Sequence, residues 1–512
     1  MWKQRKGKRI LIASAALILT AAAATGCSGG KKDGNDGSAA NVKIQVVKPA
    51  QASSVKYPDG MDDNTNPYSD YIRSSTGLDI EITAYPSEGS AYVDKLNVLL
   101  ASSDLPDMMV VPKAEQFISF LNQKALKPLN EAIDKYGSDL MKQIPQEAWD
   151  GVTIDGKIYA VPRLGDTEAT QLMYVRKDWL DNLGLQAPKT LEDYAAVAKA
   201  FAEADPDGNG KADTVGLLAG ENLDRLGPFL GAFGVQQGIW MERNGELVNG
   251  SILPEMKQAL TYLNGLYKDK VLDQEWALNK QTTINEKIGG GKAGLFSARW
   301  QDTRTPILAN KKSDPKADWI PIGYPTGPEG KSGIALGNKI SQYMVVPATS
   351  SEAEAEAVVK MLNFIVGEGF SSIKNGFENE VWTKKDGKVV IDEEQNNLHL
   401  YRLGLAFAQP GDPNLKLGRL QAIDDGDPQF KLVENINTIL KNGIPDLYTG
   451  LPTDGMGEYG AKLSSLENET FTKMIMGVIP LDDFDKFVAQ WKKDGGDEIT
   501  QEVNEWYKNK NK

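Results

Sequence analysis

The chain has 512 residues, of which 57 are Lys or Arg, 70 are Asp or Glu, one is His and one is Cys. Its formal net charge of −13 disfavours binding to nucleic acid phosphates, and no Lys/Arg cluster outside the extreme N-terminus reverses that sign locally. A single cysteine excludes a disulfide within the chain, so stability must come from a large core, and the length suffices for two domains or more.

The N-terminal segment is typical of an export signal. Five basic residues precede the apolar stretch Ile10–Ala24, which leads through Thr25 and Gly26 to Cys27. About 15 apolar residues are too few for a helix across roughly 30 Å of hydrocarbon, but they suit a signal peptide with small residues at its cleavage site. The order resembles the bacterial lipobox, although Ala24 stands where Leu is usual. A plain secretory peptide with an incidental cysteine is the alternative.

We therefore expect residues 1–26 to be a lipoprotein signal peptide and Cys27 to be acylated, for example by palmitate. Without the five basic residues of the signal, 52 basic and 70 acidic side chains remain, a net charge of −18. The residues from Ser28 to Ser38 carry no apolar side chain and cannot pack. We expect residues 27–41 to form a flexible tether to a membrane, which fixes a location but no chemistry.

Beyond the tether, the pattern predicts a mixed α/β fold. Apolar residues alternate over 42–46 and again over 78–82, as in strands, and residues 67–75 between them read as a helix that ends at Gly77. Helical spacing over 92–100 precedes a short buried strand over 108–111. Strands that alternate with helices favour a largely parallel sheet.

Capping signals mark three later helices. Thr190 with Asp193 opens a run to Ala204, Pro254 begins another helix, and Ser351 with Glu354 opens a third. We find no internal repeat and no second apolar segment long enough to cross a membrane.

Five segments, in a fixed order, carry a resemblance to a known family. They are Asp155-Gly-Lys-Ile-Tyr-Ala-Val-Pro162, Leu172-Met-Tyr-Val-Arg-Lys-Asp-Trp-Leu180 with Gly184-Leu185, Pro188-Lys-Thr-Leu-Glu-Asp193, Gly291-Lys-Ala-Gly-Leu-Phe-Ser-Ala-Arg-Trp300, and Ala353–Gly369 with Asn375-Gly-Phe-Glu-Asn-Glu-Val-Trp382. Behind a lipobox, this order resembles the bacterial extracellular solute-binding proteins of carbohydrate ABC transporters, especially the long LplA-like and alginate-binding lipoproteins.

The resemblance implies a two-lobed periplasmic-binding-protein fold of type II. Each lobe is expected to be a mostly parallel sheet flanked by helices, and crossing strands join the lobes around a ligand cleft. We expect residues 42–165 and 293–345 in lobe 1 and residues 166–292 and 346–512 in lobe 2. Extended apolar runs suit the crossings: Ile158–Pro162 and Leu172–Val175 with a turn at Gly165-Asp166, then Ala293–Phe296, then Tyr343–Val346. Lobes joined only by such segments can close around a ligand.

A sugar-binding site requires aromatic rings that pack on the C–H patches of a pyranose ring. It also requires carboxylate, amide or guanidinium groups that form hydrogen bonds with the sugar hydroxyls. Trp300 is the leading candidate, because it follows a predicted crossing strand together with Arg299 and Asp302. The other candidates follow the same logic: Arg163, Tyr174, Trp240, Tyr324, Glu378 and Trp382. For each of these residues the alternative is an aromatic packed in a core or an arginine in a surface ion pair.

A calcium loop is the sharpest local motif. Asp205, Asp207, Asn209 and Asp213 occupy positions 1, 3, 5 and 9 of an EF-hand-type loop, and the carbonyl of Lys211 would supply position 7. Position 12 is Gly216 instead of the bidentate Glu, so a remote carboxylate or water would have to complete the shell. The resemblance to alginate-binding proteins also implies a structural calcium ion here. The alternative is a turn rich in Asp and Asn that needs no metal.

Enzymatic readings have little support. The single histidine, His399, has no thiol partner, because the only cysteine lies in the signal region, and a structural role for it is the simpler interpretation. No phosphate-binding loop of the Gly-x-x-x-x-Gly-Lys-Ser/Thr type occurs. A glycoside hydrolase needs only two suitably spaced carboxylates and stays open as an alternative, as does a peptide-binding lipoprotein.

The sequence thus predicts a monomeric, non-enzymatic receptor on the extracellular face of the cell membrane. It would bind an oligosaccharide, hold a structural Ca²⁺ and deliver its ligand to the permease subunits of an ABC importer.

Overall fold

The computed structural model describes residues 42–510, except residues 53–54, 88–90, 103–104, 166–170, 337–339 and 412 and the side chains of 413–417 and 419. These residues belong to one compact unit, Asn41–Lys512. The expected signal peptide, the tether and Cys27 lie outside the described residues. Within the described part, no helix is both long and apolar enough to span a membrane.

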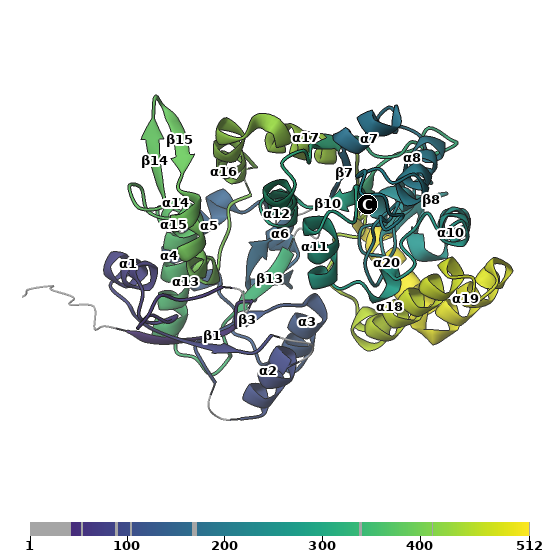
Figure 1. Cartoon of the computed structure of the whole chain (residues 1–512). Helices are drawn as coiled ribbons and strands as arrows, with labels where there is room; N and C mark the ends of the chain where they lie inside the picture. The colour runs from purple at the N-terminus through teal and green to yellow at the C-terminus, as the bar shows by residue number, and fades with distance from the viewer. Residues whose placement is uncertain are drawn as a thin grey trace, which may run out of the picture. The chain divides into compact units, whose positions relative to one another are not determined.

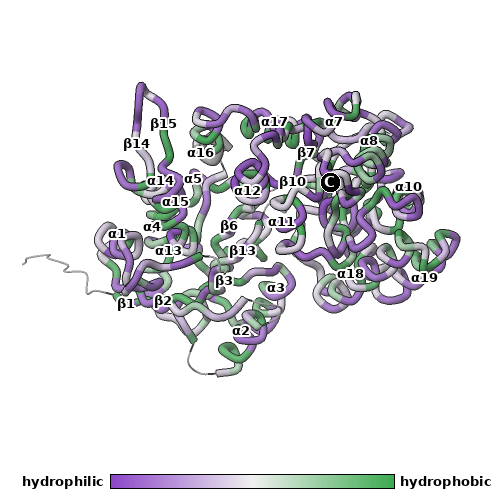
Figure 2. Tube along the Cα trace, in the orientation of Figure 1, coloured by the Kyte–Doolittle hydropathy of each residue, from purple (hydrophilic) through white to green (hydrophobic). Residues whose placement is uncertain are grey.

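The first sheet has the strand order β2-β1-β3-β13-β6. Its strands are β1 (Lys43–Pro49), β2 (Asp79–Tyr85), β3 (Met108–Val111), β6 (Val161–Leu164) and β13 (Ile340–Val345). β1 pairs in parallel with β2 and β3, whereas β13 is antiparallel to β3 and β6. All four residues of β3 are buried, as a central strand covered on both faces requires, and Figure 2 shows hydrophobic residues along β3 and β13.

Eight α-helices of the described chain contribute residues to the core of this sheet. They are α1 (Pro67–Thr76), α2 (Ala91–Ala101), α3 (Ala114–Asn122), α4 (Asn130–Tyr136), α5 (Ser138–Gln143), α6 (Gln146–Asp150), α13 (Glu352–Val366) and α14 (Phe370–Asn375). A further helix, α15 (Glu393–Leu398), buries only the polar Asn396 among its described residues. Figure 1 shows α13 and α4 next to each other. The side chain of Asn66 caps α1, and Gly77 ends it at φ 69°, a left-handed conformation that glycine adopts without strain.

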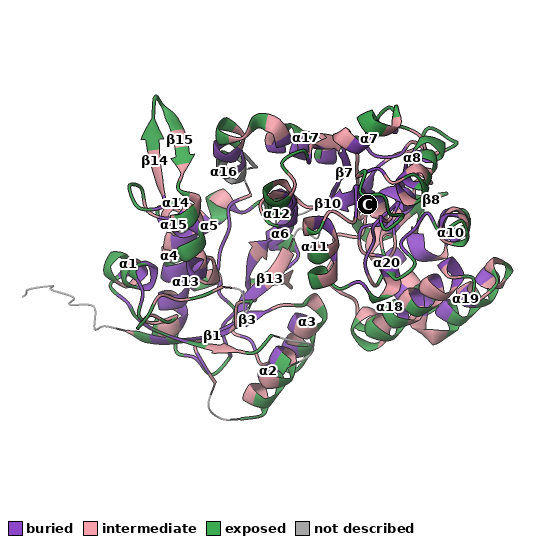
Figure 3. Cartoon of the chain, in the orientation of Figure 1, coloured by how far each residue is buried: buried purple, intermediate pink, exposed green. Residues whose placement is uncertain are grey.

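The second sheet has the order β10-β7-β11 and is antiparallel throughout. Its strands are β7 (Leu172–Arg176), β10 (Leu295–Ala298) and β11 (Trp319–Ile322). The helices that pack on its core are α7 (Lys177–Leu183), α8 (Leu191–Glu203), α9 (Gly227–Gly231), α10 (Pro254–Lys268), α11 (Gln281–Gly289), α12 (Pro306–Ser313), α16 (Pro413–Gly426), α17 (Leu432–Lys441), α18 (Asp454–Ile475), α19 (Phe484–Trp491) and α20 (Asp497–Lys510). Every residue of β7 and β10 is buried (Figure 3).

Short elements complete the described chain. Small two-stranded sheets are β4 (Thr153–Ile154) with β5 (Lys157–Ile158), β8 (Trp240–Arg243) with β9 (Glu246–Asn249), β12 (Ile334–Ala335) with β16 (Gly443–Ile444), and β14 (Trp382–Lys385) with β15 (Lys388–Ile391). The short helices are η2 (Gly250–Ile252), η3 (Trp276–Leu278), η4 (Trp300–Thr303), η5 (Leu400–Leu405), η6 (Pro428–Phe430), η7 (Leu481–Asp483) and the π-helical η8 (Lys492–Gly496).

Two separate hydrophobic cores define two lobes. The core of the first lobe takes residues between 44 and 164 and between 343 and 408, and that of the second takes residues between 172 and 334 and between 420 and 503. The chain therefore passes between the lobes after β6, before β13 and before α16.

The lobe boundaries expected from the sequence differ from this grouping. Residues 293–334 belong to the second core, because β10 and β11 pair with β7. Residues 346–408 belong to the first core, because α13 packs against α1, α4 and β1. Ala293–Phe296 and Tyr343–Val346 therefore lie inside a lobe and are not crossings. Leu164 belongs to the first core and Leu172 to the second, but Asp166 of the expected turn between them lies outside the described residues.

Most predicted elements are confirmed. The strands at 42–46, 78–82 and 108–111 are present, and both capping boxes form, Thr190 with Asp193 and Ser351 with Glu354. The mostly parallel sheet is wrong for the second lobe, since both neighbours of β7 run antiparallel to it.

Candidate functional site

The topology places one edge of each sheet at the crossings between the lobes. In the first lobe β6 is parallel to β1, β2 and β3, so its carboxyl end, from which the chain leaves, shares an edge with theirs. In the second lobe the chain arrives at the start of β7, where Leu172 pairs with Ala298 at the carboxyl end of β10. Ligands of open α/β sheets bind at carboxyl ends of strands. We call the two edges the first-lobe rim and the second-lobe rim.

A hydrogen-bonded network of three side chains marks the second-lobe rim. Gln171 directly precedes β7, Arg299 directly follows β10, and Asp224 lies in the turn before α9. Oδ1 of Asp224 accepts hydrogen bonds from Nε2 of Gln171 at 2.8 Å and from Nη2 of Arg299 at 3.0 Å. The Arg299 side chain is 36 % exposed and that of Asp224 is 31 % exposed. The network thus presents a carboxylate and a guanidinium group to solvent, whereas the amide of Gln171 is mostly buried.

Asp302 holds the backbone of this rim in place through contacts with Arg225 and Arg299. It is buried, and it forms an ion pair with the buried Arg225 at 2.9 Å. Its Oδ2 also accepts a hydrogen bond from the backbone N–H of Arg299 at 2.8 Å. The predicted role of Asp302 as a ligand contact therefore does not fit its position, because both of its oxygens are directed at neighbouring groups of the chain.

Trp300 follows Arg299 in η4 and is half-buried. It packs against the second core, and it lines a small apolar hollow together with Leu172 and Tyr174. The structure thus brings together Arg299 and Trp300 from the candidates, and it adds Gln171 and Asp224, which sequence reasoning missed. A polar break between the apolar residues 217–219 and 226–230 is the one signal that could have pointed to Asp224.

The first-lobe rim carries a second polar network. Nζ of Lys48, near the end of β1, pairs with Oδ1 of Asp63 at 2.8 Å, and the Lys48 side chain is 3 % exposed. The hydroxyl of Tyr57 donates to the same Asp63 oxygen at 2.7 Å, and partial burial raises the pKa of Tyr57. Nε2 of Gln51 donates to the carbonyl of Tyr401 at 2.7 Å. None of these residues is predicted from the sequence, because the loop after β1 carries no motif.

Arg163 lies on the same rim, at the third position of β6. Its Nε donates to the carbonyl of Ala406 at 2.7 Å and its Nη1 to the hydroxyl of Ser341 at 3.3 Å. Ser341 belongs to β13. Arg163 therefore links the strand after which the chain leaves the first lobe, β6, to the strand with which it returns, β13.

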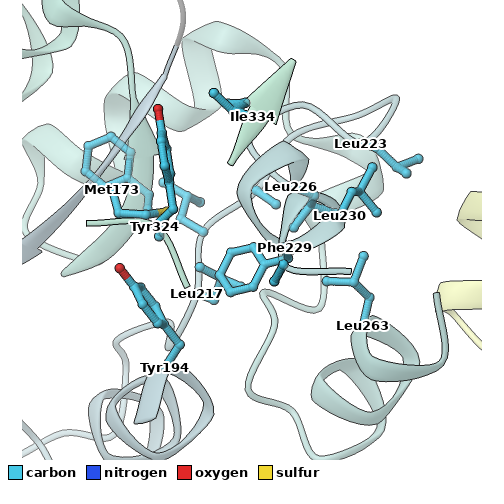
Figure 4. Packing of buried hydrophobic residues seen from close by; sticks show 14 of the residues in the cluster. Met173, Tyr194, Leu217, Leu223, Leu226, Phe229, Leu230, Leu263, Tyr324 and Ile334 are labelled. Carbon is cyan, nitrogen blue, oxygen red and sulfur yellow. The ribbon is translucent and has the colours of Figure 1, made fainter. Parts of the chain in front are cut away.

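Three of the candidates are core residues. Tyr174, Trp240 and Tyr324 are all buried in the second core (Figure 4 includes Tyr324). The hydroxyl of Tyr174 accepts a hydrogen bond from Asn435, and that of Tyr324 donates to the carbonyl of Gln171. Burial leaves no face of these rings for a sugar. The alternative interpretation, an aromatic residue packed in a core, therefore holds for all three. Tyr324 still matters to the rim, since it holds Gln171.

Glu378 lies just before the hairpin β14–β15, and Trp382 is the first residue of β14. Glu378 is exposed, and Nε1 of Trp382 donates to the carbonyl of Gly376 at 2.8 Å. The hairpin forms a two-stranded sheet of its own, so neither residue lies on the first-lobe rim or the second-lobe rim. His399 accepts or donates one hydrogen bond with the Tyr68 hydroxyl at 2.9 Å, and burial lowers its pKa.

The predicted calcium loop supplies hard oxygen donors. Nδ2 of Asn209 contacts Asp207 at 2.7 Å and Asp213 at 3.2 Å, which places three side chains of the motif together. The backbone N–H of Gly210 donates to Asp205 and lowers its pKa, whereas partial burial and the neighbouring Asp205 raise the pKa of Asp207. In the described residues no three His, Cys, Asp or Glu side chains are arranged as a ready metal site.

These residue types fit calcium chemically, since Ca²⁺ prefers carboxylate, amide and carbonyl oxygens. Lys292 forms an ion pair with Asp213 and supplies a positive charge at the loop. A bound ion would be held by the side chains of Asp205, Asp207, Asn209 and Asp213 and by the carbonyl of Lys211.

Two hydrophobic cores and the segments of chain that pass between them define a two-lobed protein. Solved structures confirm this type II fold: the alginate-binding protein AlgQ2 without calcium ion superimposes with a TM-score of 0.73 at 18% identity, and Streptococcus pneumoniae FusA in complex with kestose with 0.72 at 17%. Each alignment covers 92% of this chain and 99% of the other.

The model of the bacterial extracellular solute-binding protein family matches residues 74–369, and the chain belongs to that family. Lipoprotein LipO of Bacillus subtilis is 28% identical over 96% of this chain and 97% of its own length. The polygalacturonan/rhamnogalacturonan-binding protein YtcQ of the same organism is 27% identical over 85% of this chain and 87% of its own.

Proposed function

We propose that this chain is a lipid-anchored extracellular receptor that binds an oligosaccharide between its two lobes and delivers it to an ABC importer. The relatives named above include a polysaccharide-binding protein and a substrate-binding protein in complex with kestose. Those names support a carbohydrate ligand for this chain.

The observation that carries the proposal is the network of Gln171, Asp224 and Arg299 beside Trp300. Carboxylate, amide and guanidinium groups form hydrogen bonds with vicinal sugar hydroxyls, and an aromatic face packs on the C–H patches of a pyranose ring. The site lies where the chain crosses between lobes, so a ligand held there can also contact the first-lobe rim. Contacts to both rims would favour closure of the lobes.

Ligand contacts from the first lobe are assigned to Arg163 and Gln51, with the Lys48–Asp63 pair beside them. The proposed contacts thus come from both lobes and include no paired carboxylates with a catalytic role. Binding without turnover distinguishes this receptor from a glycoside hydrolase.

Calcium binding belongs to the same proposal. AlgQ2 has been solved without calcium ion and FusA as an EF-hand mutant, and these descriptions support a calcium loop in proteins of this fold. For this chain we propose that residues 205–213 bind one Ca²⁺, which ties α8 to the segment that follows the loop. The role is structural, since the loop and the second-lobe rim share no residue.

Attachment to the membrane is proposed through acylation of Cys27, supported by its lipobox-like setting and by the naming of LipO as a lipoprotein. Mass spectrometry of the mature N-terminus tests it: a diacylglyceryl modification on Cys27 is expected, and an unmodified Cys27 contradicts the anchor.

The test of the function is calorimetry of the full chain in a mild detergent. The panel contains neutral and acidic plant and bacterial oligosaccharides and, as the competing ligand class, short peptides. We expect one glycan to bind with a stoichiometry of one and to be recovered intact by mass spectrometry. Cleaved glycan, or binding of peptides alone, would refute the proposal.

A further inference from the structure

The turn that carries Asp224 is held in a strained conformation. Asn222, Leu223 and Arg225 have φ values of 57°, 59° and 73°, in the left-handed region. Side chains with a Cβ adopt this region at an energetic cost, and a leucine does so least readily of the three. Three such residues within four positions require other interactions to maintain them.

Packing supplies part of that support. Leu223 and Leu226, which lie on either side of Asp224 in the sequence, are buried in the second core, and Figure 4 includes both among the packed side chains. The backbone N–H of Gly220 donates to the carbonyl of Asp224 at 3.0 Å, which closes the turn. The turn is therefore fixed at both ends.

Arg225 supplies the remaining support for the strained turn. Its buried guanidinium group donates through Nη1 to the carbonyl of Ser297 at 2.5 Å and to Asp302 at 2.9 Å. Ser297 belongs to β10, and Asp302 also holds the backbone of Arg299. Arg225 therefore connects the turn to the segment that carries Arg299 and Trp300.

The same guanidinium group faces Asp224. Nε of Arg225 is buried without a hydrogen-bond partner, and it lies 3.7 Å from Oδ2 of Asp224. Both internal hydrogen bonds of that carboxylate go to Oδ1. In the described part of the chain Oδ2 accepts no hydrogen bond and is the oxygen left for a ligand hydroxyl.

We propose that Arg225 is a positioning residue, which uses the strained turn to fix Oδ2 of Asp224 before a glycan binds. A carboxylate on a relaxed loop would have to be ordered during binding, whereas a preset one requires no such ordering, so affinity is gained. This inference rests on the proposed function, because it assigns Asp224 as a glycan contact.

The experiment compares Arg225→Met with Arg176→Met in the full chain, by calorimetry with the best glycan of the panel. Arg176 is a matched control: it is equally buried and paired with Asp178 and Asp314, but it lies at the opposite end of β7. Both variants are expected to melt at a lower temperature. We expect Arg225→Met to raise Kd about threefold to tenfold at unchanged stoichiometry, and Arg176→Met to leave Kd unchanged.

Arg225→Lys covers the case in which the methionine variant does not fold. Lysine keeps the positive charge beside Asp302 but has no fork to reach Ser297 as well, so we expect an intermediate Kd. A wild-type Kd in either Arg225 variant, or an equal loss in Arg176→Met, would overturn the positioning role and leave the proposed function intact. If the wild-type chain binds no glycan, the proposed function falls and this role with it.

Discussion

Replacing Asp224 by Asn removes one charge from the second-lobe rim and with it the attraction to Nε of Arg225 at 3.7 Å, while Arg225 keeps its ion pair with Asp302. Asparagine has the same shape and keeps an oxygen in place of Oδ1, so it can still accept hydrogen bonds from Gln171 and Arg299. What is lost is the charged acceptor at Oδ2, which becomes an amide that can only donate.

The magnitudes differ for stability and for binding. The Asp224 and Arg299 side chains are 31 % and 36 % exposed, so their ion pair contributes only about 0.2–1 kcal/mol to the free energy of unfolding. A hydrogen bond from a ligand hydroxyl to a charged group is worth about 1.5–3 kcal/mol. We therefore expect Kd to rise about tenfold to 150-fold, while the melting temperature falls by no more than about 2 °C.

Calorimetry and thermal unfolding of the same samples separate these effects. Asp181→Asn is the matched control, since Asp181 pairs with Lys177 on α7 and both side chains are more exposed. We expect this control to bind like the wild type. If Asp224→Asn binds the glycan with the wild-type Kd, Asp224 is not a ligand contact and the reasoning about the second-lobe rim is wrong.

Three further predictions use other parts of the chain. Trp300→Ala should weaken glycan binding at least about fivefold in a titration, because the aromatic face is lost, whereas Ala in place of the half-buried Trp506 of α20 should not. Burial raises the pKa of Asp446 to about 6, so the folded state binds the proton more tightly than the unfolded state. Stability should therefore fall as pH rises from about 4 to 6, by at most roughly 3 kcal/mol, and Asp446→Asn should flatten that decline in unfolding experiments at each pH. Calcium should raise the melting temperature of the wild type but not of Asp205→Asn; an equal rise in both would exclude the loop as the binding site.

The local elements could be predicted because their signals are local. Alternating apolar residues gave β1 and β2, and Thr190 with Asp193 gave the start of α8. Strand direction and lobe membership depend on pairing across long separations, as between β7 and β10, and no short pattern encodes those pairs. For this reason residues 293–345 were expected in the first lobe.

The candidate site was partly predictable for a similar reason. Arg299 and Trp300 follow β10, and a position after a strand is visible in the sequence. Whether a nearby carboxylate faces solvent or a buried guanidinium is not visible, so Asp302 was chosen although it pairs with Arg225, and Asp224 was missed. Some aromatic candidates proved to be core residues, because the sequence does not show which residues of a fully buried strand point to a ligand. Tyr174 is an example, since it lies on a strand that is buried at every position.

The crystal structure of the chain with its best glycan tests the central claim most directly. The account predicts an intact glycan in contact with both rims, with a hydroxyl within hydrogen-bond distance of Oδ2 of Asp224 and a sugar ring against Trp300. A glycan bound elsewhere on the chain, or contacts to one lobe alone, would contradict it.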